Sequence, residues 1–200
     1  MKYMMCALAL VLFAAPVTVL AQAVPGKPAP AFEVTDALGK AQKLENFKGK
    51  WLVLEWFNKD CPYVKKHYGS GNMQKLQKTY SDKGVAWLSV ISSKKGAQGH
   101  LTPAEASRLP ASHNSAASAV LLDESGEMGR AYGATATPHM FVINPKGQVV
   151  YAGAIDDNDS SNPEVIAKSK NYIVAALDAG ISGKPVATAS TRAYGCGIKY

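Results

Sequence analysis

The feature that most constrains the fold is the apolar run WLVLEWF at residues 51–57, which ends shortly before a Cys-Pro pair. The run consists mainly of residues that favour β-strands, and its apolar residues are consecutive rather than alternating. A strand of this kind suits the centre of a sheet that is covered on both faces. Because proline is well tolerated in the first turn of a helix, the sequence predicts a helix that starts at Pro62, directly after Cys61.

The rest of the chain continues this alternation of strands and helices. A second apolar run, VAWLSVI at residues 85–91, predicts another buried strand, and Thr102 with Glu105 three residues later predicts a capped helix start. Further strands are predicted at 32–35, 119–123, 139–143 and 148–153, and helices at 62–69, 73–81, 126–133 and 163–179. This order of elements predicts one α/β domain with a mixed central sheet flanked by helices.

The N-terminal residues predict a secretory signal peptide. Lys2 precedes an unbroken apolar run at 6–15, and the small residues Ala21 and Ala23 suit a cleavage site. The apolar run is too short to cross a bilayer comfortably, so we expect a periplasmic or otherwise exported protein without a stable membrane anchor. The predicted organisation is a signal peptide at 1–23, a folded domain at 24–182 and a C-terminal tail at 183–200 that carries Cys196.

Charge and cysteine content restrict the classes of function that this chain can have. The formal charge of +7 becomes +6 when Lys2 leaves with the signal peptide, and the positive residues are scattered along the chain. Without a basic stripe interleaved with aromatic residues, we expect no nucleic-acid partner. Only Cys61 and Cys196 remain in the mature chain. In an oxidising compartment two cysteines either pair or stay open to oxidation, so these two are the candidate redox centre.

Five blocks of the sequence carry a resemblance to a known family. GKPAPAFEVTDALGK and GRAYGATATPHMFVINPKGQVVYAG resemble the opening and the second half of a redoxin domain, and the match runs from about residue 24 to 153. EWFNKDCPYVKKHYGSGNMQKLQ, YAGAIDD and YGCGIKY resemble exported bacterial redoxin-domain proteins with a single Cys-Pro motif. The chain therefore resembles the thioredoxin-like superfamily, in its redoxin (AhpC/TSA-like) branch, and this resemblance implies a thioredoxin-like fold.

The redoxin branch contains both thiol-disulfide oxidoreductases and peroxiredoxins. Peroxiredoxins carry a Thr three residues before the reactive cysteine and a Pro seven before it, where this chain has Asn58 and Leu54. Thioredoxins carry a buried acid six residues before the nucleophile and a cis-proline that faces it, and Glu55 and Pro138 match those positions. The resemblance thus implies disulfide exchange, with a thiol-dependent peroxidase as the alternative.

Cys61 is the predicted nucleophile and Glu55 its predicted proton partner. A cysteine ahead of a helix meets unpaired backbone N–H groups and the positive end of the helix dipole, and Lys59, Lys65 and Lys66 lie near it in sequence. We therefore expect a lowered pKa for the Cys61 thiol. An acid inside an apolar strand is expected to have a raised pKa, which suits Glu55 to take up or release the thiol proton.

A substrate site is predicted at Pro62, Thr137 and Pro138. A cis bond between Thr137 and Pro138 would expose backbone that can pair with an extended substrate. The expected substrate is a protein or small-molecule thiol, disulfide or peroxide, and an unidentified reductant would restore the reduced protein. His67 is assigned to the solvated face of the helix.

The redox partner of Cys61 has to lie far away in sequence. Val64 occupies the position where an oxidoreductase of this fold carries its second cysteine, so Cys196 is the remaining candidate, and its flanking glycines let the backbone bend. We predict that Cys196 resolves the mixed disulfide formed at Cys61, and that reduction of a Cys61–Cys196 bond frees the tail. The same bond could instead be purely structural and stabilise the fold by about 4–5 kcal/mol in the chain-entropy model.

A third interpretation is a copper-binding module that uses Cys61, Cys196 and a histidine, because thiolates and imidazole suit copper. Copper chaperones of this fold have two cysteines four residues apart, and Lys65 occupies the second position here. We therefore expect neither a metal nor another cofactor.

Overall fold

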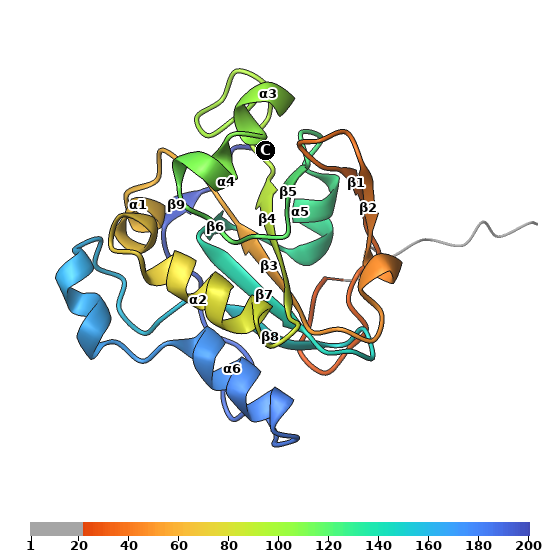
Figure 1. Ribbon diagram of the computed structural model, residues 1–200, viewed down its shortest axis with the longest axis vertical. Helices are drawn as coiled ribbons and strands as arrows, with labels where there is room; N and C mark the ends of the chain where they lie inside the picture. The colour runs from red at the N-terminus through yellow and green to blue at the C-terminus, as the bar shows by residue number, and fades with distance from the viewer. Residues whose placement is uncertain (1–21) are drawn as a thin grey trace, which may run out of the picture.

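The fold is built around a five-stranded mixed sheet in the order β5-β4-β3-β7-β8 (Figure 1). The computed structural model describes residues 22–200. β3 is central, as the apolar run predicts, and it runs parallel to β4 and antiparallel to β7. The strands span Leu52–Trp56 (β3), Ala86–Ile91 (β4), Ala119–Leu122 (β5), His139–Ile143 (β7) and Val149–Gly153 (β8).

Each face of the sheet has its own apolar core, because successive residues of β3 point in opposite directions. Val53 belongs to the core under α1, α2 and α6, whereas Leu54 and Trp56 belong to the core under α5. The helices span Pro62–Gly69 (α1), Asn72–Ser81 (α2), Glu127–Tyr132 (α5) and Tyr172–Ile181 (α6). Burial of both faces explains why the β3 run is apolar at consecutive positions, with Glu55 as its exception.

Short elements complete the domain at its edges. A hairpin of β1 (Glu33–Thr35) and β2 (Ala41–Lys43) lies outside the main sheet, and α3 (Pro103–Ala106) and α4 (Leu109–Ser112) follow β4. Thr102 caps α3 as predicted: its Oγ1 accepts from the backbone N–H of Glu105 at 3.3 Å, and the Glu105 carboxylate accepts from the backbone N–H of Thr102 at 2.8 Å.

The predicted helix at 163–179 is wrong in its extent. A 3₁₀ helix at Pro163–Lys168 and the α-helix α6 are separated by three residues. The break has two causes: the Asn171 side chain caps α6 by accepting from Ile173 and Val174, and the backbone here pairs with the segment after β8. Tyr172 N–H donates to Ile155 O at 2.9 Å. These bonds compete with the helical pattern and end it.

The C-terminal tail runs beside the end of β8, where Ser190 forms a parallel bridge with Ala152, and continues to β6. Its strand β9 (Cys196–Gly197) pairs antiparallel with β6 (Ala136–Thr137), so that Cys196 lies opposite Thr137. Figure 1 shows this part of the tail beside β6 and near α1. Gly195 has a φ of +127°, and a side chain there would collide with the carbonyl oxygen of Thr137, so glycine is required for this close approach.

The predicted signal peptide lies, except for its last two residues, outside the described part of the chain. Within residues 22–200, no helix combines the length and the apolar character that a membrane crossing needs. The proposed division into signal peptide, domain and tail stays a prediction.

Candidate active site

Cys61 is the N-cap residue of α1, at the end of the loop that follows β3. Its backbone is extended, its N–H donates to Asn58 O at 3.1 Å, and its carbonyl accepts the N–H of Lys65 at 2.9 Å. Pro62 is the first residue of the helix and is exposed, as a residue at the rim of a site should be. The Cys61 residue itself is 0% exposed. A substrate can therefore reach this thiol only after a covering segment moves.

The pKa of the Cys61 thiol lies below its ordinary value. Burial acts to raise this pKa, but hydrogen bonds from the Cys196 thiol, from Thr137 and from the backbone N–H groups of Val64 and Cys196 outweigh it. The Val64 N–H belongs to the first turn of α1, so the predicted helix-start effect is present. No lysine is among the causes of this shift, and Lys59 pairs instead with Asp60 at 2.9 Å.

Thr137 and Pro138 lie opposite Cys61, where the resemblance places them. The peptide bond between them is cis, as predicted. The Cys61 thiol donates to Thr137 O at 3.0 Å, and Thr137 is also the residue that pairs with Cys196 in β6–β9. Both Thr137 and Pro138 are buried. The backbone that would receive an extended substrate is thus occupied by the tail of the same chain.

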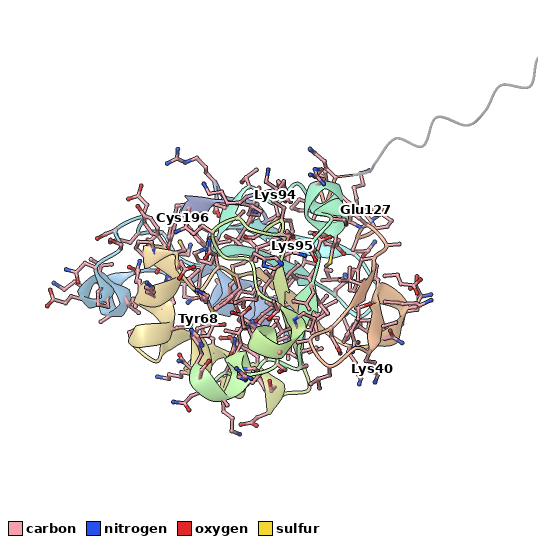
Figure 2. All side chains as sticks on the ribbon, turned by 90° about the horizontal axis from the view of Figure 1, so that it is seen from above. Lys40, Tyr68, Lys94, Lys95, Glu127 and Cys196 are labelled. Carbon is pink, nitrogen blue, oxygen red and sulfur yellow. The ribbon has the colours of Figure 1, made fainter. Side chains whose placement is uncertain are left out.

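Cys196 is brought into hydrogen-bond contact with Cys61, and both are free thiols in this structure. Burial, the hydrogen bond to Cys61 and the charge of the Cys61 thiolate all raise the pKa of the Cys196 thiol. The two thiols therefore differ in acidity, and Cys61 is the more easily ionised of the pair. Figure 2 shows Cys196 on the side of the molecule that carries α1, away from Lys40 and the β1–β2 hairpin.

The tail is docked although the two cysteines are not bonded to each other. Pairing of β9 with β6 and the bond from Thr137 Oγ1 to Cys196 O at 3.4 Å hold it in place. These contacts act against the expected release of the tail on reduction, which stays a prediction. Noncovalent contacts keep Cys196 at the nucleophile in the reduced protein.

Glu55 is buried beneath α1 and α2, and burial raises the pKa of its carboxyl to about 7 despite three hydrogen bonds. Its Oε2 accepts from the Trp87 indole at 2.8 Å, from the Tyr68 hydroxyl at 3.1 Å and from the Gln77 amide at 3.3 Å. Its Oε1 has no partner. The raised pKa is as predicted, but among the described residues no hydrogen bond joins Glu55 to Cys61.

The sequence analysis did not predict that α1, the helix capped by Cys61, carries buried polar and charged side chains. His67 was assigned to a solvated face, yet it is 0% exposed, and the same is true of the Lys66 side chain. Lys66 Nζ lies 3.4 Å from Asp156 Oδ2 and donates to Asn158 O at 2.8 Å. Lys66 therefore neutralises Asp156 rather than the Cys61 thiolate. The available signal was that Asp156 belongs to the YAGAIDD block of the family resemblance.

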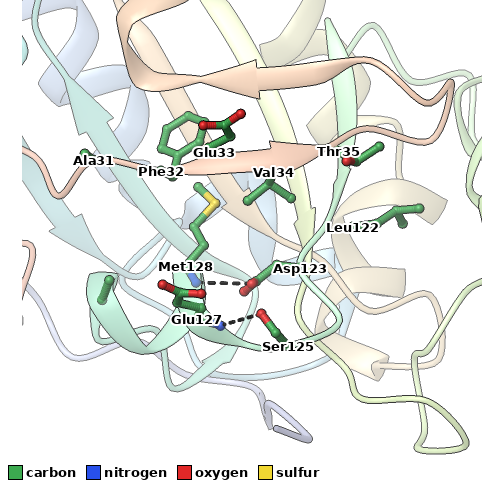
Figure 3. A pocket seen from close by; sticks show the side chains of 11 residues that line it. Ala31, Phe32, Glu33, Val34, Thr35, Leu122, Asp123, Ser125, Glu127 and Met128 are labelled. Atoms are coloured by element: carbon green, nitrogen blue, oxygen red, sulfur yellow. Dashed lines mark hydrogen bonds between the residues drawn. The ribbon is translucent and has the colours of Figure 1, made fainter.

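One hollow of the molecule lies away from the cysteines. A cavity of about 360 Å³ between β1 and the start of α5 is lined by Phe32, Asp123 and Met128, among others (Figure 3). Of the three acids that line it, Asp123 is tied to the start of α5, because its carboxylate accepts the backbone N–H groups of Met128 and Gly129. Among residues 22–200, no group of three or more His, Cys, Asp or Glu side chains is arranged to hold a metal ion.

A mixed sheet, a cysteine at the start of a helix and a cis-proline opposite it define a thioredoxin-like protein. The model of the AhpC/TSA family matches residues 25–152. The chain belongs to this family.

Comparisons with known proteins agree with this assignment. The thiol-disulfide oxidoreductase ResA of Bacillus thuringiensis subsp. konkukian is 29% identical over 126 residues, which cover 62% of this chain and 66% of the relative. The chain thus matches just under two thirds of that relative's length. An uncharacterized conserved protein from Geobacillus kaustophilus is similar in structure with a TM-score of 0.77 and 28% identity, over 90% of this chain and 93% of that one.

A more distant structure shows the fold alone. The thioredoxin domain of a thiol-disulfide oxidoreductase from Bacteroides vulgatus has a TM-score of 0.52 and 18% identity, over 72% of this chain and 96% of that domain. The α/β thioredoxin-like fold predicted from the sequence is confirmed.

Proposed function

We propose that this chain is an exported thiol-disulfide oxidoreductase in which Cys61 is the nucleophile and Cys196 the resolving thiol. The observation that carries the proposal is that both cysteines meet at Thr137: its carbonyl oxygen accepts from the Cys61 thiol at 3.0 Å, and Cys196 lies opposite it in the β6–β9 pair. The pKa is lowered at Cys61 and raised at Cys196. The similarity to a relative named thiol-disulfide oxidoreductase supports the reaction type. Export is supported by the N-terminal sequence pattern.

The first step is attack on a substrate disulfide. The Cys61 thiolate attacks one sulfur, the substrate S–S bond breaks, and the departing sulfur leaves with the electron pair and takes up a proton. The product is a mixed disulfide between Cys61 and the other half of the substrate. Because the tail covers Thr137 and Pro138, the β6–β9 pairing has to open for this step. Pro62, Thr137 and Pro138 then form the edge on which the substrate lies.

The second step returns Cys196 to Cys61. Once Cys61 is bound in the mixed disulfide it no longer carries a negative charge, so two of the three causes that raise the Cys196 pKa are removed. Cys196 then ionises more easily, attacks the Cys61 sulfur and releases the second half of the substrate as a thiol. The substrate disulfide has become two thiols, and the protein has gained a Cys61–Cys196 disulfide that an external dithiol reductant must reduce.

Glu55 is proposed to influence Cys61 through its charge. Its carboxyl has a pKa of about 7, so it changes charge in the pH range in which exchange occurs. Since its hydrogen bonds go to Trp87, Tyr68 and Gln77, we place its effect in the electric field beneath α1 rather than in direct proton transfer.

A trapping experiment tests the proposal. Cys196→Ser leaves Cys61 able to attack but removes internal resolution, so the variant should accumulate mixed disulfides with an exported protein or with a model protein disulfide. Cys61→Ser in the same background is the matched control and should trap nothing.

A second measurement compares substrates. The reduced wild-type protein should turn over a protein disulfide faster than it consumes hydrogen peroxide. Rapid peroxide consumption without disulfide turnover would instead assign the protein to the thiol-dependent peroxidases, with a Cys61 sulfenic acid that condenses with Cys196.

A further inference from the structure

A buried polar group joins the tail to α1, and we call it the Asp156 cluster. It consists of Lys66, His67, Asp156 and Tyr194. The side chains of Lys66 and His67 are 0% exposed and that of Asp156 is 3% exposed. The Tyr194 hydroxyl donates to Asp156 Oδ1 at 2.5 Å, and His67 Nε2 lies 3.3 Å from the same hydroxyl. Hydrogen bonds to a charged group in such surroundings are stronger than neutral ones.

The hydrogen bonds of the Asp156 cluster have one consistent direction. Burial lowers the pKa of His67 to about 4, so its ring is neutral at neutral pH. The Asn72 amide lies 2.8 Å from His67 Nδ1 and is a donor there, which assigns the ring proton to Nε2. His67 Nε2–H then donates to the Tyr194 oxygen, and Tyr194 donates to Asp156. The phenol thus has both a donor and an acceptor to orient it.

The geometry of α1 connects this anchor to the nucleophile. Cys61 caps the helix, and Lys66 and His67 lie one to two turns further along it. The ring of Tyr194 also packs 5.6 Å from the ring of Tyr63, between centroids. α1 therefore carries both Cys61 and the groups that hold the tail at Tyr194, two residues before Cys196.

We propose that Tyr194, held by the Asp156 cluster, is a positioning residue that keeps Cys196 against Cys61 for disulfide closure. This inference rests on the proposed function. In the closing step the Cys196 thiolate attacks the sulfur of Cys61 in the mixed disulfide, the mixed S–S bond breaks, and the substrate sulfur leaves with the electron pair and takes up a proton. Anchoring Tyr194 raises the effective concentration of Cys196 at that sulfur without touching either reacting atom.

The tail has a second attachment beyond Cys196, so loss of the Tyr194 hydroxyl loosens the tail rather than releasing it. The Tyr200 hydroxyl donates to Ala134 O at 2.7 Å, and the Lys94 N–H donates to Lys199 O at 2.9 Å. Cys196 is thus held from both sides, and only the Tyr194 side is tied to the helix that carries Cys61.

The test is Tyr194→Phe, which removes the hydroxyl and keeps the ring. In glutathione buffers of graded redox ratio, the equilibrium between the Cys61–Cys196 disulfide and the dithiol should shift toward the dithiol by about tenfold, which equals about 30 mV for a two-electron couple. Tyr80→Phe is the matched control, because the Tyr80 hydroxyl also donates to a carboxylate, Asp178, at 3.0 Å but lies far from the tail in sequence. It should leave the equilibrium unchanged.

Thermal unfolding of both variants separates positioning from general stability. Comparable losses of stability with a shifted equilibrium only in Tyr194→Phe support the proposal, and Tyr194→Ala should shift it further. Equal shifts in both phenylalanine variants, or no shift in Tyr194→Phe, would overturn it. The equilibrium is read on the protein's own disulfide, so failure of the proposed enzymatic function would show separately, as absent substrate trapping in Cys196→Ser.

Discussion

Cys61 and Cys196 are hydrogen-bonded to each other, but the molecule holds them in different ways. Cys61 sits between a central strand and a helix, with its backbone fixed by Asn58 and Lys65. Cys196 belongs to a two-residue strand in the C-terminal tail, which noncovalent contacts hold against β6 and the Asp156 cluster. The contrast extends to chemistry, because the pKa is lowered at Cys61 and raised at Cys196. The more acidic thiol, fixed at the start of α1, suits attack, and the less acidic thiol, on the tail, suits resolution.

The largest expected effect is on turnover of a protein disulfide. Cys61→Ser should reduce turnover to the uncatalysed rate, since no other described cysteine shares the helix-start environment. Cys196→Ser should keep part of the turnover when excess small thiol is present, because an external thiol can replace the resolving step. Rates measured for both variants across thiol concentrations check this. Equal rates in the two variants at high thiol would show that the cysteines do not divide the roles.

The second prediction concerns the contribution of the Asp156 cluster to the free energy of unfolding. Asp156→Ala should lower the free energy of unfolding by about 3–5 kcal/mol, because Lys66 is left buried without its counter-ion. Asp82→Ala is the control: the Asp82 side chain is 60% exposed in its pair with Lys78, so the loss should stay below about 1 kcal/mol. Urea titration measures both values. A small loss for Asp156→Ala would mean that Lys66 finds water or another partner.

A third prediction uses pH and concerns Glu55. Its carboxyl pKa is raised from 4.5 to about 7 in the folded protein. The folded state therefore binds the proton more tightly than the unfolded state, and the associated stability is present below pH 4.5 and lost as the pH rises toward 7. Glu55→Gln should remove this loss, so the variant should gain about 3 kcal/mol relative to wild type between these pH values. Unfolding free energies measured at pH 4 and pH 8 give the difference directly. A constant difference would show that Glu55 keeps an ordinary pKa.

The smallest expected effect is on access to the tail. Arg192 is exposed in the segment before Cys196, so trypsin can cut there when the tail opens. Because β9 and the Asp156 cluster hold the tail in the reduced state, reduction should speed this cut by less than about tenfold. Gel analysis of oxidised and reduced protein over time tests it. Immediate cleavage on reduction would show that the disulfide alone holds the tail.

The sequence predicted the central strand and the helix start that hold Cys61. The apolar run at 51–57 specifies a two-sided central strand, and Pro62 specifies the helix start, because both signals are local. The nearness of Cys196 to Cys61 followed from the cysteine count and the family resemblance. The structure bears out the contact and the cis bond before Pro138.

The Asp156 cluster could not be predicted in the same way. Helical spacing puts Lys66 and His67 on a polar part of α1, and such a pattern is the same whether water or another segment covers it. The cover comes from Asp156 and Tyr194, which lie far along the chain. The break before α6 was not predicted for a related reason, because it depends both on the Asn171 cap and on pairing with the backbone near Ile155.

The reduction potential of the Cys61–Cys196 disulfide is the most direct test of the central claim, that these cysteines form a working redox pair. The oxidised protein, purified without reductant, should contain one intramolecular bridge, which peptide mapping identifies before the titration in glutathione or dithiothreitol buffers. The account predicts a potential more oxidising than about −300 mV, the region of labile and catalytic disulfides. A potential well below about −300 mV would contradict it, because the bond would then be a structural staple and Cys61 would have no resolving partner within the chain.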